Sequence, residues 1–342
     1  MARSYRPARL LRPALAAVML AGALTGPWQA TATAAACQAW TFGQPPSPGT
    51  ADNTLNSVTV LSACDAWAVG TTRDSGGASQ TLIEHWAGSS WNVVPSPSPG
   101  TTGNGLSGVR AVSPTDIWAV GVFSTSSVDQ TLILHWNGTN WQQVPSPSPG
   151  SNFSELSGLH ATSASNAWAV GELGTSLGDQ TLILHWNGTK WARVPSPSPG
   201  LGDDLTGVAA TSASNAWAVG FSIVGAAAKA SETAQALALH WNGSTWTSAA
   251  VPNPGPGMST LLNGVTVTST TNALAVGLSE SPTTEQGLIV RWNGTAWNQV
   301  SAPSPGTVSF LSAVAATSVS SAWAVGRFST NVVGQSLAIR CC

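Results

Sequence analysis

The sequence predicts an all-β protein built from six similar units, and three observations support this prediction. A tryptophan that stands after a turn recurs about every fifty residues, at Trp40, Trp91, Trp141, Trp191, Trp246 and Trp297. Each interval holds short runs of alternating or β-branched residues separated by turn-forming residues, which is the pattern of strands in a meander. Charged residues make up only 8% of the chain, and this composition disfavours long helices.

One unit shows where the four strands of each unit are expected. "LSGVRAVS" (106–113) and "IWAVGVF" (117–123) predict the first two strands, and "TLILHWN" and "NWQQV" predict the third and fourth. The dipeptide Asn137-Gly138 between the last two favours a two-residue type I′ turn, because both residues tolerate positive φ. The proline-rich run 145–150 lacks the N–H donors of a central strand, so it should be an extended connection to the next unit.

Units that cannot bury both faces alone pack radially, and the sequence therefore predicts a six-bladed β-propeller of four-stranded antiparallel blades. The last unit stops at "SLAIRCC" without a fourth strand, and "CQAWTFG" from Cys37 resembles a fourth strand without the three before it. Joining Cys342 to Cys37 on paper continues the period in register. We therefore expect the N-terminal strand to complete the last blade and close the ring.

The N-terminus has the pattern of a secretory signal peptide. Four arginines precede the apolar run 14–24, and a stretch of small residues follows it. Residues 1–36 are the predicted signal peptide and residues 37–342 the predicted propeller, secreted and extracellular. A lipid anchor on Cys37 is the alternative to a free N-terminus.

Four cysteines in an exported chain predict two disulfides. They are Cys37, Cys64, Cys341 and Cys342. The splice of the two chain ends places Cys37 beside Cys341 and Cys342, so one disulfide should clasp the ring. Cys64 should pair with whichever of the two C-terminal cysteines Cys37 leaves free.

The charge balance excludes some classes of partner. The predicted signal peptide carries four basic residues and no acidic one, so its removal leaves an acidic chain and argues against nucleic acid or anionic membrane as a partner. No other segment is long and apolar enough to span a membrane. We expect a monomer that binds an extracellular protein or a carbohydrate. Neither an HExxH nor a CxxC motif is present, and we expect no cofactor and no metal.

The units resemble a known repeat family. "IWAVG", followed by a loop, a tryptophan before a turn and a tryptophan after it, is similar to the kelch repeat, and the turn resembles the Asp-box hairpin of sialidase-like propellers. Kelch units end the second strand with paired glycines, whereas here a single glycine such as Gly121 stands there. The resemblance implies the propeller fold. Among propeller enzymes of the resembled types, sialidase-like ones use a tyrosine as nucleophile and galactose-oxidase-like ones use a tyrosine as copper ligand. The single tyrosine, Tyr5, lies in the predicted signal peptide, so neither activity is expected.

The tryptophans and histidines follow the repeat. Trp118, Trp136 and Trp141 mark three positions that recur in the units, which favours packing between blades over stacking on sugar rings. The histidines His85, His135, His185 and His240 share one repeat position in four different blades, too far apart to hold one metal ion.

Candidate binding residues are those that depart from the repeat. Arg110 and His160 replace small residues on first strands, and Glu172 replaces an apolar residue after the second-strand glycine. We expect these three to form one polar ligand site near the central channel; a buried pair of Arg110 with Glu172 is the alternative. Lys229 and Glu232 lie in a long insertion of the fourth unit and are further candidates, because long loops often carry recognition.

The sequence favours a secreted non-catalytic propeller that acts as a binding scaffold for protein or polysaccharide, and it assigns no catalytic residue. Two alternatives stay open: a lectin with repeated sugar pockets, and a glycosidase or polysaccharide lyase that uses loop carboxylates.

Overall fold

A computed structural model describes residues 44–225, 232–330 and 334–341. In this part of the chain all regular secondary structure is β, as the sequence predicts. None of the described residues belongs to a helix long and apolar enough to cross a membrane. Gln44–Cys342 form one compact unit. The predicted signal peptide lies outside the described residues.

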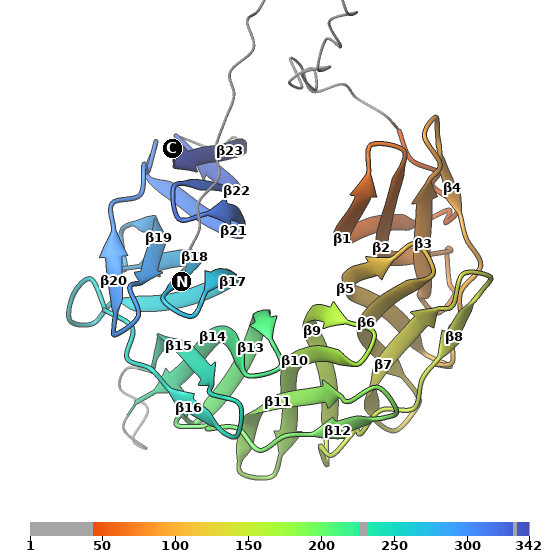
Figure 1. The fold of residues 1–342 in the computed structure, drawn as a ribbon, viewed down its shortest axis with the longest axis horizontal. Coiled ribbons are helices and arrows are strands. Elements are labelled where there is room, and N and C mark those ends of the chain that lie inside the picture. The colour runs from red at the N-terminus through yellow and green to blue at the C-terminus, as the bar shows by residue number, and fades with distance from the viewer. Residues whose placement is uncertain (1–43, 226–231, 331–333, 342) are drawn as a thin grey trace, which may run out of the picture. The chain divides into compact units, whose positions relative to one another are not determined.

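The strands group in chain order into six antiparallel units (Figure 1). The first unit contains β1 (Asp52–Ser62), β2 (Asp65–Arg73), β3 (Gln80–Trp86) and β4 (Trp91–Val93); the second contains β5 (Gly103–Ser113), β6 (Asp116–Ser124), β7 (Asp129–Trp136) and β8 (Trp141–Gln143). The third contains β9 (Phe153–Ser163), β10 (Asn166–Thr175), β11 (Gly178–Trp186) and β12 (Trp191–Arg193); the fourth contains β13 (Gly202–Ser212), β14 (Asn215–Val224), β15 (Thr233–Trp241) and β16 (Trp246–Ser248). The fifth contains β17 (Ser259–Ser269), β18 (Asn272–Glu280), β19 (Glu285–Trp292) and β20 (Trp297–Val300); the sixth contains β21 (Val308–Ser318), β22 (Ser321–Ser329) and β23 (Gly334–Cys341).

The predicted hairpin between the third and fourth strands is confirmed, but its two-residue type I′ turn is wrong. Trp136 pairs with Trp141, so four residues lie between the strands. The side-chain oxygen of Asn137 accepts hydrogen bonds from the backbone N–H groups of Thr139 and Asn140, at 3.0 and 3.1 Å. Gly138 supplies a positive φ, 93°. The asparagine therefore acts through its side chain, which closes a longer loop than the dipeptide rule predicts.

The proline-rich connections are extended, as predicted, and serine hydroxyls attach them to the third strand. The N–H of Thr131 in β7 donates to Ser148 Oγ at 3.1 Å, and Thr131 Oγ1 lies 2.8 Å from Ser146 Oγ. Matching contacts hold the connections of the first and third units. The serines thus supply the hydrogen bonds that the prolines cannot donate.

Close packing of two strands explains the single glycine that ends "WAVG". A Cβ atom on Gly121 would lie 2.1 Å from the carbonyl oxygen of Gly105 in β5. The register of β5 against β6 shifts at this place, between Leu106 and Gly108. The other units show the same approach at Gly70, Gly171, Gly220, Gly277 and Gly326. One glycine per unit satisfies this requirement, and a second one has no such role.

Tryptophans pack between neighbouring units, as the repeat predicts. Trp118 of the second unit is 2% exposed, and its ring lies 4.9 Å from Trp186 and 5.4 Å from Trp191 of the third unit. The same arrangement joins Trp67, Trp168 and Trp217 to the pairs that follow them. Second-strand and fourth-strand tryptophans therefore form the core between units, and their buried rings are not free to stack on a sugar.

The repeated histidines have structural partners. His135 stacks on Trp118 with ring centres 4.1 Å apart, and its Nε2 lies 2.8 Å from Asp116 Oδ1. His85, His185 and His240 stack and bond in the same way. No group of three possible metal ligands occurs among the described residues.

Neighbouring units contact one another through their first strands, from β1 and β5 to β17 and β21. No comparable contact joins β21 to β1 in the described part of the chain. The facing side chains are exposed: Val60 of β1 by 67% and Trp323 of β22 by 52%. The predicted closure of the ring is therefore absent from the described residues. In this part of the chain the last unit has three strands, and no fourth strand pairs with the outer edge of β23.

The predicted disulfides are likewise absent from the described residues. Cys64 and Cys341 are both exposed, free thiols. Cys37 and Cys342 lie outside the described residues, so the pairing that would clasp the ring stays a prediction.

Candidate functional site

The strand order gives the assembly of units two faces, which carry different loops. The connections between units and the loops from second to third strands lie on one face, which we call the connection face. The loops from first to second and from third to fourth strands lie on the other, the turn face. Glu155 is near the start of β9, Glu172 near the end of β10, and Asp204 near the start of β13. All three carboxylates therefore lie near the connection face, on adjacent units.

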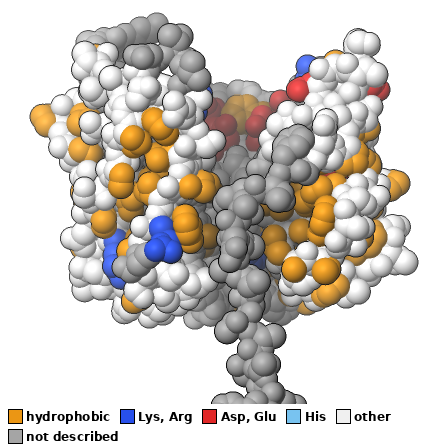
Figure 2. All heavy atoms as spheres, turned by 90° about the horizontal axis from the view of Figure 1, so that it is seen from above, with side chains coloured by type: hydrophobic (Ala, Val, Ile, Leu, Met, Phe, Trp, Pro, Cys, Tyr) orange, Lys and Arg blue, Asp and Glu red, His pale blue; other side chains and the backbone are white. Residues whose placement is uncertain are grey.

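These carboxylates form one group, which we call the acidic cluster. Its members are Asp129, Glu155, Glu172, Asp179 and Asp204. The charge of each member raises the pKa of another member, or its own pKa is raised by the charge of another member. Figure 2 shows acidic side chains gathered near the upper edge of the surface in that view. Among the described residues no member forms a salt bridge with Lys, Arg or His. The cluster therefore concentrates uncompensated negative charge.

Burial and mutual repulsion raise the pKa values in the acidic cluster. Burial, Asp204, Asp179 and Glu155 together raise the pKa of Glu172 to about 7. Burial, and then the charge of Glu155, raise the pKa of Asp204 to about 6 against a smaller opposing effect of the Leu205 backbone. The pKa of Glu155 is raised by burial and by Asp129. Near neutral pH the cluster therefore holds both a protonated carboxyl group and ionised carboxylates.

Strand pairing holds two members of the cluster opposite each other. Glu155 of β9 is the direct cross-strand partner of Glu172 of β10. Like charges in this position destabilise a sheet, and proton uptake by one of them relieves the repulsion. The cluster is thus built into strands, and the predicted use of loop carboxylates stays a prediction.

The structure brings Arg110 and His160 together in a second place. Both line a cavity of about 710 Å³ among the first strands, together with small residues such as Ala209 and Thr266. Nδ1 of His160 accepts a hydrogen bond from the backbone N–H of Ala210 at 3.3 Å. Burial, and the charge of Arg110, lower the pKa of His160 to about 4, so this imidazole is neutral at physiological pH.

Glu172 lies outside the cavity of Arg110 and His160. On β10, Trp168 pairs with His160, whereas Glu172, four residues further on, pairs with Glu155. This separation is about 13 Å along the strand. Arg110 and Glu172 form no salt bridge within the described residues, so the expected single site is divided into two. Of the insertion residues, Glu232 is exposed and Lys229 lies outside the described residues.

Sequence reasoning missed four members of the acidic cluster, although the repeat contains a signal for them. Glu155 and Asp204 occupy the position that is Gly105 in the second unit and Leu261 in the fifth. The residue at this position differs in every unit, and a comparison of the units would have shown that only Glu155 and Asp204 are acidic there. Asp129 and Asp179 also match each other in position, directly before "QTLILHW".

Comparisons with known proteins show the fold. No family model and no curated protein matches the chain. The chain is similar to a solved polysaccharide lyase of family PL25, an ulvan lyase bound to -[GlcA(1-4)Rha3S]-, at 8% identity, over 82% of this chain and 79% of that one, with a TM-score of 0.56. It is also similar to the GH93 α-L-arabinofuranosidase of Fusarium graminearum, at 13% identity, over 84% and 92% of the two chains, and to the GH74 xyloglucanase of Xanthomonas campestris, at 12% identity, over 81% and 45%, each with a TM-score of 0.52.

These similarities correct the functional expectation. The similar structures are β-propeller proteins, so the propeller prediction is confirmed at the level of the fold. Most of those compared are carbohydrate-active enzymes, which favours the enzyme alternative over the expected non-catalytic scaffold. The scaffold interpretation is therefore replaced. The resemblances to kelch and Asp-box repeats gain no support from these comparisons and stay predictions.

Proposed function

We propose that the protein is a carbohydrate-active enzyme that hydrolyses glycosidic bonds at the acidic cluster. One observation carries this proposal: strands of two adjacent units, β10 and β13, hold carboxyl groups whose pKa values are raised to about 7 and about 6. Hydrolysis of a glycosidic bond needs one carboxyl group that is protonated and one that is ionised, and environments that raise one pKa above another create such a pair. The similar carbohydrate-active enzymes support this choice of reaction class.

The roles follow from the order of the pKa values. Glu172, with the higher pKa, donates its proton to the glycosidic oxygen as the bond between that oxygen and the anomeric carbon breaks. Asp204 is mostly ionised at neutral pH and accepts a proton from the attacking water, whose oxygen bonds to the anomeric carbon. Glu155 raises the pKa of both groups through its own charge.

The charge of the cluster indicates the substrate class. A polysaccharide that carries uronate or sulfate groups would meet uncompensated carboxylates at this site, and like charges oppose association. A neutral polysaccharide meets no such barrier. We therefore propose a neutral glycan as substrate, in contrast to the ulvan substrate named for the similar lyase.

A substrate panel tests this function. The chain from Cys37 to Cys342 is incubated with arabinan, xyloglucan and ulvan, and both new reducing ends and unsaturated uronate products are measured. We expect reducing ends from a neutral glycan, and a loss of kcat of about 10²-fold or more in Glu172→Gln and Asp204→Asn. Glu280→Gln is the matched control, because Glu280 is exposed at the end of a strand of the fifth unit.

Three outcomes would overturn the proposal. Folded protein that hydrolyses no neutral glycan, unsaturated products from ulvan, or full activity in Glu172→Gln would each contradict hydrolysis at the acidic cluster.

We further propose that the six units form a closed, monomeric ring in the exported chain. Apolar side chains on both end units support this proposal: Val58 is 60% exposed in the first unit, whereas Val109, at the same position of the second, is 6% exposed. Val325 is 47% exposed in the sixth unit, whereas its counterpart Val120 is fully buried. Contact between the end units would bury these side chains as the other units do.

Export and the disulfide clasp belong to the same proposal. Cleavage after residue 36 would free Cys37 for pairing with Cys341 or Cys342, in an oxidising compartment. Mass spectrometry of the protein recovered outside the cell tests both points. An N-terminus other than Cys37 would contradict the cleavage site, a lipid on Cys37 would support the anchored alternative, and four free thiols would contradict the clasp.

A further inference from the structure

The cavity that Arg110 and His160 line has no part in the proposed hydrolysis. It lies among the ends of the first strands of the second to sixth units, at the turn face, whereas the acidic cluster lies near the connection face. Figure 1 shows the first strands on the inner side of the assembly and the fourth strands on the outer side. Strands of five described units build the cavity, so its walls do not depend on contact between the first unit and the last.

One first-strand position determines the room in this cavity. The position lies opposite the second-strand tryptophan, and it is Arg110 in β5 and His160 in β9. In the next three units small side chains occupy it: Ala209, Thr266 and Ala315. The small residues leave a space of about 710 Å³ beside the two large polar side chains, which is enough for a small organic molecule.

In two units the residue at this position accepts a hydrogen bond from the backbone of the next unit. Thr59 Oγ1 accepts from the N–H of Ala111 at 3.2 Å, and His160 Nδ1 accepts from the N–H of Ala210 at 3.3 Å. The two alanines hold the same register position in their units. The repeat therefore pairs an acceptor side chain of one unit with a donor N–H of the next.

Arg110 reverses this pattern, because arginine only donates hydrogen bonds. Ala161 holds the register position of the donor alanines in the third unit, so its N–H faces the side of Arg110. The guanidinium group and this N–H are then two donors at one contact. Arg110 forms no salt bridge within the described part of the chain. A negatively charged oxygen ligand accepts hydrogen bonds from both donors and balances the guanidinium charge.

His160 adds another donor to the same cavity. Because its Nδ1 accepts the N–H of Ala210, the proton of the neutral imidazole is on Nε2. Burial, and the charge of Arg110, lower the pKa of His160 to about 4, so the ring keeps this form at neutral pH. The cavity thus has an N–H donor at Nε2 and gains no second positive charge.

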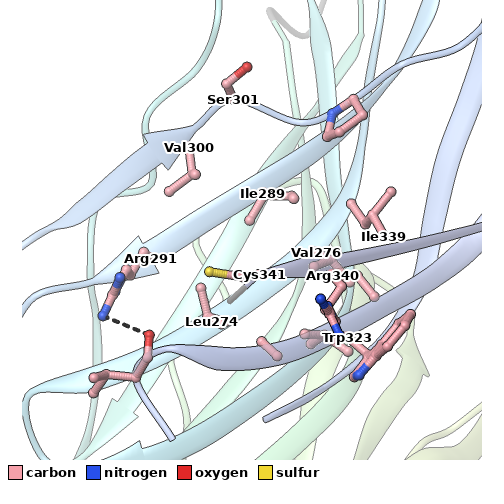
Figure 3. Close-up of a pocket in the computed structure, with 15 residues that line it drawn as sticks. Leu274, Val276, Ile289, Arg291, Val300, Ser301, Trp323, Ile339, Arg340 and Cys341 are labelled. Carbon is pink, nitrogen blue, oxygen red and sulfur yellow. Dashed lines mark hydrogen bonds between the residues drawn. The ribbon is translucent and has the colours of Figure 1, made fainter.

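Other arginines of the fold have partners within the protein. Arg291 and Arg340 line an apolar pocket of about 300 Å³ between the fifth and sixth units (Figure 3). Arg291 donates to Asn272 Oδ1 at 3.1 Å and to the carbonyl oxygen of Val319 at 3.3 Å, and Figure 3 shows the second of these bonds as a dashed line. Arg340 lies over a tryptophan ring, 5.7 Å from its centre. Arg110 has neither kind of partner among the described residues.

We propose that this cavity binds the carboxylate group of a small organic ligand through Arg110, His160 and the backbone N–H of Ala161. The planar guanidinium group matches a carboxylate with two parallel hydrogen bonds. Of the described residues that line the cavity, Arg110 alone is charged at neutral pH, so one negative charge is balanced and a doubly charged phosphate or sulfate is not. Valine and alanine side chains such as Val208 and Ala209 provide an apolar wall for the rest of the ligand.

Calorimetric titration of the chain from Cys37 to Cys342 at pH 7 tests the site. The probes are two matched pairs of acid and amide, benzoate with benzamide and hexanoate with hexanamide, together with inorganic phosphate and sulfate. We expect saturable binding of one carboxylate per chain, about tenfold or more tighter than binding of its amide, because the amide leaves the guanidinium charge unbalanced. The two pairs distinguish an aromatic from an aliphatic acid.

Three variants locate the binding. Arg110→Gln removes the charge and should weaken binding of the carboxylate about tenfold or more. His160→Thr keeps a hydroxyl acceptor like that of Thr59 and removes the Nε2 donor, so it should weaken binding about threefold or more. Arg193→Gln is the matched control, because Arg193 is exposed on β12 outside the cavity, and its affinity should equal that of the wild type. Urea denaturation checks that each variant is folded.

Four results would overturn the proposal. They are equal binding of acid and amide, tighter binding of phosphate or sulfate than of either carboxylate, no binding of a carboxylate by the folded protein, and unchanged affinity in folded Arg110→Gln. If Arg110→Gln does not fold, the comparison of acid with amide and the affinity of His160→Thr decide the question. These readouts do not involve turnover, so a failure of the carboxylate site is distinguishable from a failure of the proposed hydrolysis.

Discussion

Replacement of Glu172 by glutamine should stabilise the protein at alkaline pH while it abolishes hydrolysis. The folded state raises the pKa of Glu172 from an ordinary 4.5 to about 7. A carboxyl group with a raised pKa contributes its stability below the unfolded pKa and loses it as the pH rises through the folded pKa. Ionisation of Glu172 therefore weakens the fold progressively between about pH 4.5 and pH 7.

The size of this effect follows from the pKa difference. A shift of this size corresponds to about 3 kcal/mol, and partial exposure of the side chain reduces the expected effect to about 2 kcal/mol. Glutamine cannot ionise, so the free energy of unfolding of Glu172→Gln should exceed that of the wild type by about 2 kcal/mol at pH 8 and match it at pH 4. Removal of the charge also lowers the repulsion on Asp204, which acts in the same direction.

Urea denaturation followed by tryptophan fluorescence at pH 4, 6 and 8 measures the difference. The control Glu280→Gln removes one exposed carboxylate outside the acidic cluster, and at pH 8 it should change the free energy of unfolding far less than Glu172→Gln does. If wild type and Glu172→Gln lose stability in parallel as the pH rises, then Glu172 does not titrate near neutrality, and the assignment of the proton donor is refuted.

Three further predictions address the pH profile and the fold. The initial rate of hydrolysis by the wild type should fall as the pH rises through about 7, because Glu172 then loses the proton that it must donate. A rate that stays constant up to pH 9 would contradict this role. Trp118→Ala should cost about 3–5 kcal/mol by chemical denaturation, and Trp323→Ala should cost a similar amount if the ring closes, whereas a loss below about 1 kcal/mol would indicate that Trp323 stays exposed. Gly121→Ala should cost more than 3 kcal/mol by thermal unfolding because its Cβ would meet the Gly105 carbonyl, whereas Gly257→Ala, with nothing within 4 Å, should show only the smaller cost of its positive φ.

The sequence was sufficient to predict the strands and their order, because the signals for them are local and repeated six times. The run that contains Ile117 and Trp118 alternates as a strand must, and the prolines of 145–150 exclude a central strand. The Asn137 turn was predicted wrongly, since the dipeptide rule considers backbone preference alone and this asparagine bonds through its side chain. A sequence repeat predicts the strands within each unit, but it does not predict the contact between the first unit and the last.

The candidate site was harder to predict because it depends on distances between units. Arg110 and His160 were found as departures at one register position, and the structure does place them in one cavity. Glu172 was found in the same way, but the antiparallel register carries it to the connection face, beside Glu155. The opposition of these two carboxylates is a property of strand pairing, and single positions in a sequence do not show it.

Catalysis, as proposed above, would account for a group of carboxylates that weakens the fold that holds it. Packing does not require a carboxylate at the repeat position of Glu155 and Asp204, because the other units carry Thr54, Gly105, Leu261 and Phe310 there. The carboxylates instead raise one another's pKa values, which means that each additional ionisation costs stability. They also lie on adjacent units at one face, whereas unselected departures would be spread around the repeat. A group of side chains that opposes the fold, on rigid strands at one end of the assembly, has the properties of a site for proton transfer.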